Sequence, residues 1–154
     1  MPDERMNERI LFCTDFSQNA RAAFFQALRL TEANDGCELI IFHVVPEPNA
    51  QFWKSYIYEV EEIDKKARAD IDEKLEKEYT SHIPDRVSWR FEAAVGKAEQ
   101  KILEKAETGD VDLIVIGRQG SSRVRTWFYG NTVGRIVRHS VCPVLVVPFR
   151  PGGA

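Results

Sequence analysis

A glycine-rich stretch between a predicted strand and a predicted helix is the part of this chain best suited to chemistry. Two residues separate Gly117 from Gly120, and nine separate Gly120 from Gly130. Residues 117–140 contain no aspartate or glutamate but five arginines: Arg118, Arg123, Arg125, Arg135 and Arg138. The chain has 21 basic and 24 acidic residues, a net charge of −3, so without these arginines the remainder has 16 against 24, or −8. A cationic, glycine-rich loop in an acidic chain indicates an anionic ligand held by backbone amides.

The glycines predict how such a ligand would be held. Gly117 and Gly120 allow backbone conformations with positive φ and the close approach of a ligand. Gly130 lies just ahead of a helix, so phosphate oxygens could reach the free N–H groups of its first turn. The alternative is that the glycine-rich segment is only a structural loop whose arginines lie in solvent. The absence of acidic residues and the position between a strand and a helix favour the binding of an anion.

Side chains near these glycines add donors and positive charge. Asn131 and Thr132 offer polar groups at the start of the helix. The guanidinium groups of Arg118, Arg123 and Arg125 could neutralise phosphate charge. No lysine and hydroxyl pair follows the glycines as in a Walker A loop, and the spacing is not G-x-G-x-x-G, so P-loop hydrolysis is not predicted.

The remaining reactive residues predict no catalytic or metal site. The three histidines, at 43, 82 and 139, are scattered, and no Ser/His/Asp or Cys/His arrangement can be argued. The three cysteines, at 13, 37 and 142, have no metal-ligand spacing and are predicted to be small buried hydrophobes.

The elements that must position the glycine segment form an alternating pattern. Apolar runs predict strands at 10–13, 39–45, 87–93, 111–116 and 144–147. Helices are predicted after the N-cap Ser17, from Tyr56 to Tyr79 as one long amphipathic helix, from Ala98 to Ala106, and over 132–138. This order predicts an α/β fold, a Rossmann-like open parallel sheet of five strands with helices on both faces. The alternating pattern of 87–93 and the prolines that bracket 144–147 place these two strands at the edges.

The first and fourth strands are expected at the centre, because they are continuously apolar. Their carboxyl ends bring Thr14 and Asp15 together with Gly117, where ligands bind in open parallel sheets. Asp15 has two interpretations. Its carboxylate could stabilise the following helix N-terminus, or it could contact a ribose hydroxyl or a metal.

Length and composition fit one globular domain over residues 1–154, with a core at about 9–148. With 44% hydrophobic and 29% charged residues, wholesale disorder is excluded. No apolar run approaches the ~20 residues that cross a bilayer, and residues 1–9 lack a secretory core, so a cytoplasmic protein without membrane contact is expected. The mildly acidic total argues against nucleic-acid binding.

The chain resembles the universal stress protein family, in the branch that binds ATP. The resemblance rests on the G-x2-G-x9-G spacing, on the strand ending in Asp15-Phe-Ser17, and on the closing sequence from His139 to Pro148. It covers residues 9–148. The family's fold is a five-stranded parallel sheet of order 3-2-1-4-5, which agrees with both edge predictions.

The resemblance implies a role for each matching position. Thr14 and Asp15 would lie against the ribose and adenine, Val44 would line the base pocket, and Ile116 and Gly117 would sit by the ribose and phosphates.

It also implies that Gly120 and Gly130 line the phosphate loop and that Asn131 and Thr132 bind the phosphates. The family pattern has Ser or Thr directly after the last glycine, where this chain has Asn131. An amide still offers a donor and an acceptor to phosphate, but it has no hydroxyl for Mg²⁺.

The implied function is that of a stress-response regulatory module that binds ATP, with or without Mg²⁺, and is not a fast enzyme. The alternatives are slow ATP hydrolysis or self-phosphorylation, and a nucleotide-free interaction protein. Similar proteins dimerise by pairing the last strand with its copy. Because Val144–Val147 is an apolar edge strand, a symmetric homodimer is expected.

Overall fold

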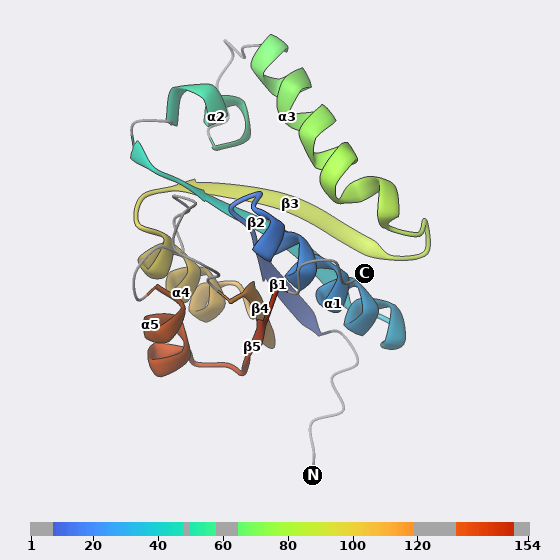
Figure 1. The fold of residues 1–154 in the computed structure, drawn as a ribbon, viewed down its shortest axis with the longest axis vertical. Coiled ribbons are helices and arrows are strands. Elements are labelled where there is room, and N and C mark those ends of the chain that lie inside the picture. Colours follow the sequence, from blue (N-terminus) through green and yellow to red (C-terminus); the bar gives the residue numbers. More distant parts are fainter. Residues whose placement is uncertain (1–7, 48–49, 58–64, 119–131, 150–154) are drawn as a thin grey trace.

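The computed structural model describes residues 8–47, 50–57, 65–118 and 132–149. Its centre is a five-stranded parallel sheet of order β3-β2-β1-β4-β5, as predicted (Figure 1). The strands are β1 (Arg9–Cys13), β2 (Glu38–Val45), β3 (Ser88–Val95), β4 (Leu113–Gly117) and β5 (Val144–Val147). The helices are α1 (Gln18–Ala33), α2 (Ala50–Ile57), α3 (Lys65–Glu78), α4 (Ala98–Thr108) and α5 (Thr132–His139), with a 3₁₀ turn η2 (Thr80–His82) after α3.

The helices cover both faces of the sheet (Figure 1). Side chains alternate between faces along a strand, and β3 shows which helix lies on which side. Phe91 contacts Tyr56 of α2, whereas the next residue, Glu92, bonds Lys105 of α4 at 2.9 Å. α1 and α3 share the face of α2, since Tyr79 at the end of α3 packs on Phe12 of β1.

The three inner strands are buried on both sides, which explains their unbroken apolar sequences. Every residue of β1 after Arg9 is buried, as are the last seven of β2 and the last four of β4. The edge strands β3 and β5 are only partly buried, as their prolines and alternation predicted. Two of the predicted buried cysteines, Cys13 and Cys37, are buried, whereas Cys142 is half-buried.

The predicted single helix from Tyr56 to Tyr79 is wrong. Tyr56 belongs to α2, a separate helix with a different direction from α3 (Figure 1). The two helices bury their apolar faces against different neighbours. Tyr56 packs edge-on against Phe91 of β3, whereas Tyr79, after α3, packs against Phe24 of α1. A helical repeat in the sequence cannot distinguish one helix from two that share a periodicity.

The predicted cap of α1 is present, since the Ser17 side chain accepts a hydrogen bond from the Ala20 N–H at 3.2 Å. This cap fixes where the chain turns from β1 into α1, directly after Thr14 and Asp15. Within the described part of the chain, no helix is both long and apolar enough to cross a membrane.

Candidate functional site

The register of β1 and β4 brings the predicted site residues side by side. Cys13 is level with Ile116 of β4 and with Phe42 of β2. The next residues, Thr14 after β1 and Gly117 at the end of β4, therefore lie side by side at the carboxyl end of the sheet. Two hollows formed by described residues, of about 490 and 440 Å³, lie at the opposite, amino-terminal end of the sheet. At the carboxyl end, residues 119–131 lie outside the described part of the chain, and the described side chains there belong to the turn after β1 and to the end of β4.

Thr14 is fully buried, and its polar atoms are all used to hold the turn. Its N–H donates to the carbonyl of Phe42 at 2.9 Å. Its hydroxyl accepts from the Phe16 N–H at 2.8 Å and is hydrogen-bonded to the Tyr79 hydroxyl. Its carbonyl oxygen lies 2.8 Å from Nδ1 of His43. Thr14 therefore positions its neighbours.

The carboxylate of Asp15 has one oxygen committed and one unused. Oδ1 accepts from the Ser17 N–H at 2.9 Å, which supports the start of α1. Oδ2 is buried and has no hydrogen-bond partner among the described residues. Each of the two interpretations of Asp15 is therefore compatible with one oxygen. Oδ1 supports the start of the helix, and Oδ2 is available to accept a hydrogen bond from a ligand.

Phe16 holds the turn in a strained backbone conformation. Its φ is +64°, a region that bulky residues rarely adopt. The ring stacks on Trp53 of α2 and on Tyr79, and the ammonium of Lys74 lies 4.4 Å from its centroid. Packing from α2 and α3 therefore offsets the strain and fixes Asp15 in place.

His43 joins β2 to this turn and is neutral at physiological pH. Burial lowers the pKa of its imidazole to about 4; the hydrogen bond to the Thr14 carbonyl opposes that shift, and Lys74 adds to it. The ring lies 4.6 Å from Trp53 and 4.9 Å from Phe16, centroid to centroid. Because a carbonyl only accepts, Nδ1 carries the proton.

Gly117 has to be a glycine because the backbone of α1 passes too close to it for a side chain. A Cβ at this position would lie 2.7 Å from the Asn19 carbonyl carbon and 3.1 Å from the Ala20 nitrogen, in the first turn of α1. Its φ is not positive. Gly117 therefore does not use the positive φ that glycine allows: among the described residues, its close approach is to the backbone of α1.

These residues stand in a chain that matches a known family. The model of the universal stress protein family matches residues 6–148. The chain belongs to the universal stress protein family. A putative universal stress protein from Staphylococcus saprophyticus is 30% identical over 139 residues, which cover 90% of this chain and 81% of that protein.

Solved structures share the universal stress protein fold with this chain. A universal stress protein in complex with cAMP superposes with a TM-score of 0.61 at 21% identity, covering 94% of this chain and 98% of the other. A family member from Arabidopsis thaliana with AMP bound also has a TM-score of 0.61, at 15% identity, covering 94% of each chain. At these identities the likeness establishes the fold.

Other predicted residues of this universal stress protein are spread around the carboxyl end. Val44 and Ile116 are buried on the face of the sheet that α4 covers. Val44 pairs with Ala94, which shares a face with Glu92, and Ile116 pairs with Cys13, which is level with Glu92. Arg118 is exposed, and its N–H donates to Val147 at 2.7 Å. Thr132 is the first residue of α5. The remaining predicted residues, Gly120, Arg123, Gly130 and Asn131, lie outside the described residues.

The positive charge of the glycine segment is less available than the sequence indicated. The guanidinium of Arg135 lies 2.8 and 3.1 Å from the two carboxylate oxygens of Glu99 in α4. Arg138 lies in the last turn of α5, far from the helix N-terminus. Of the arginines in the described part of this segment, Arg118 is the one that directly follows β4.

Sequence reasoning missed the aromatic residues that support the turn. His43 was one of three scattered histidines and Tyr79 the end of a predicted helix, whereas Trp53 had no predicted role. The available signal was the concentration of aromatic residues near 52–58 in a chain that must cover the end of β2. Their partners, on other elements, could not be read from spacing.

Proposed function

We propose that this universal stress protein binds an adenine nucleotide, ATP in particular, at the carboxyl ends of β1 and β4. It acts as a regulatory module of the stress response whose contacts depend on the bound nucleotide. Asp15 carries the proposal. A buried carboxylate oxygen without a partner is costly, and a ligand hydroxyl or amino group would satisfy it. The ribose hydroxyls and the adenine amino group are such donors.

The chemistry of the neighbouring groups fits the rest of a nucleotide. Arg118 is exposed directly after β4, where its guanidinium could pair with a phosphate. Thr132 begins α5, a helix N-terminus next to the glycine segment and therefore suited to phosphate oxygens. The predicted phosphate contacts of Gly120, Gly130 and Asn131 are part of the proposal, as is a weakened Mg²⁺ contact because Asn131 has no hydroxyl.

The relatives support an adenine ligand. One solved family member is in complex with cAMP, and another has AMP bound. Both ligands contain the adenine ring and a ribose, so the shared part is the part that Asp15 would recognise. The positive charges of Arg118, Arg123 and Arg125 favour the triphosphate of ATP, because they could neutralise its phosphates.

Asp15→Asn tests the proposal with little change in shape. The amide oxygen can still accept from the Ser17 N–H, while an NH₂ group replaces Oδ2 and faces the ligand donor. Hydrogen bonds to charged groups contribute about 1.5–3 kcal/mol, so ATP affinity should fall about tenfold to a hundredfold in isothermal titration calorimetry. Asp35→Asn, in the exposed turn after α1, makes the same charge change and should leave affinity intact. Equal affinity of Asp15→Asn and the unaltered protein would remove Asp15 from the site.

We also propose a symmetric homodimer formed through β5. No described strand pairs with its outer edge, and Leu145 and Val141 are exposed nearby. Pairing with a second copy would cover this apolar edge. Sedimentation equilibrium should give twice the chain mass of 17.6 kDa. The Leu145→Lys variant should have the mass of a single chain. A monomer at tens of micromolar in the unaltered protein would exclude this dimer.

A further inference from the structure

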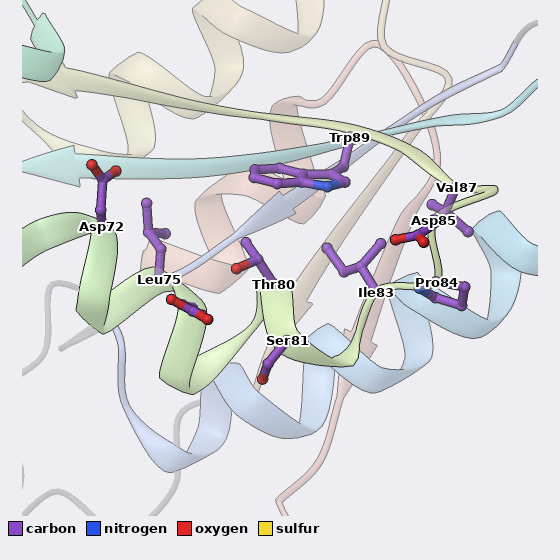
Figure 2. A pocket seen from close by; sticks show the side chains of 10 residues that line it. Asp72, Leu75, Thr80, Ser81, Ile83, Pro84, Asp85, Val87 and Trp89 are labelled. Atoms are coloured by element: carbon purple, nitrogen blue, oxygen red, sulfur yellow. The ribbon is translucent and has the colours of Figure 1, made fainter.

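A hollow beside the first residues of β3 lies far from the proposed nucleotide site. It has a volume of about 490 Å³ and lies between the end of α3, η2 and the amino end of β3 (Figure 2). Its apolar lining consists of Leu75, Ile83, Pro84, Val87 and Trp89. We refer to it as the β3 groove. A hollow of this size falls within the usual range of ligand sites.

An indole ring and unpaired carboxylates give the β3 groove its chemistry. Trp89 is 41% exposed, and its ring lies along one side of the groove, with Asp72 and Asp85 toward opposite ends (Figure 2). Glu76 adds a third carboxylate. All three acids are exposed, and none makes an ion pair with another described residue. Among the described residues, no lysine or arginine lines the groove.

This combination selects a cationic partner. An arginine or lysine side chain over the face of an indole gains about 0.5–1 kcal/mol at an exposed site. A guanidinium adds planar hydrogen bonds to carboxylates, which a spherical inorganic cation cannot make in the same way. The charge of the groove is complementary to arginine, and its apolar floor is complementary to the methylene stem of that side chain.

The strand beside the groove offers the backbone of such a partner a place to bind. β3 pairs with β2 along its whole length and, among the described strands, has no neighbour on its other side. An extended segment added to a free edge gains main-chain hydrogen bonds, and its alternate side chains project on one face. On the α3 face, those side chains would meet Trp89 and the carboxylates.

We propose that the β3 groove and the outer edge of β3 together bind an extended, arginine-containing segment of a partner protein. The segment adds a strand to the sheet, and its arginines lie over Trp89 between Asp72 and Asp85. The site is at the amino end of the sheet, so partner binding and nucleotide binding occupy different surfaces of the same protein.

Peptide titrations of the full-length protein, followed by ¹⁵N NMR, test this proposal. The probe is a capped eight-residue peptide of alternating arginine and threonine. We expect saturable shifts of the Trp89 indole N–H and of the amides of 88–95, and no binding by a peptide with glutamate in place of arginine. A third peptide, N-methylated at alternate amides, cannot complete the strand ladder and should not bind. Its binding at equal strength would overturn strand addition.

Matched variants separate the groove from general attraction to an acidic protein. Asp72→Asn/Asp85→Asn should weaken binding of the arginine peptide about fivefold, as expected for two exposed ion pairs. Asp70→Asn/Glu73→Gln removes the same charge from exposed positions of α3 that do not line the groove and should change affinity by less than twofold. Equal weakening in both variants, or the absence of shifts at millimolar arginine peptide, would overturn the proposal.

Discussion

His43 should make the stability of this protein depend on pH between about 4 and 6.5. Its pKa is lowered from 6.5 to about 4, chiefly by burial. In that window the unfolded chain binds a proton that the folded protein does not, so acidification favours unfolding. The contribution is fully present above pH 6.5 and is lost as the pH falls toward 4.

The size of this effect follows from the two pKa values. A difference of about 2.5 units corresponds to at most about 3 kcal/mol. Between pH 7 and pH 5, the linkage relation gives a loss of about 2 kcal/mol from His43. Carboxylates also begin to titrate in this range, and a variant without the imidazole is needed to subtract them.

His43→Asn is that variant, because its amide nitrogen can occupy the place of Nδ1 and donate to the Thr14 carbonyl. Urea unfolding should show that the unaltered protein loses about 2 kcal/mol more than His43→Asn between pH 7 and pH 5. An NMR titration of the His43 ring in the unaltered protein gives the pKa directly. A measured pKa of 6.5 or higher, or equal losses in the two proteins, would show that burial does not lower the pKa of His43.

Three further substitutions test the packing that positions Asp15, each by urea unfolding at pH 7. Gly117→Ala should destabilise by about 1–3 kcal/mol, because its Cβ would overlap the first turn of α1; a neutral result would mean that α1 shifts freely. Tyr79→Phe removes the hydroxyl bonded to Thr14 and should cost about 1 kcal/mol; no loss would show that this bond adds nothing. Ser17→Ala should cost about 1 kcal/mol through the lost cap, whereas Ser81→Ala, at an exposed position in η2, should cost less than half of that.

The fold was predictable because its evidence is local and repeated. Continuous apolar runs mark the buried parallel strands 10–13, 39–45 and 111–116, and alternation or flanking prolines mark the edges. These patterns predicted the edge strands and the central strands. The full order 3-2-1-4-5 was implied by the family resemblance, and the structure confirms it. The helix prediction failed at Tyr56, because the boundary between α2 and α3 depends on which neighbour each helix packs against.

The positions of the candidate site residues were predictable only where their place along a strand decides which residues lie together. Asp15 follows β1 and Gly117 ends the adjacent parallel strand β4, so topology alone brings them together. The pairing of Arg135 with Glu99 and the support of Phe16 by Trp53 join elements that are distant in the sequence. The role of Gly117 was missed for the same reason, since α1 lies over it. Nucleotide contacts at 119–131 stay a prediction.

An ATP titration followed by backbone ¹⁵N NMR is the sharpest test of nucleotide binding at the carboxyl ends of β1 and β4, because it reports both binding and its location. We expect saturable shifts at Thr14 to Ser17, at 116–118 and at Thr132, together with a raised melting temperature from binding to the native state. GTP, which lacks the adenine amino group, should shift the same amides only at higher concentration. The absence of shifts at millimolar ATP, or shifts confined to the amino ends of the strands near Arg9 and Asp112, would contradict it.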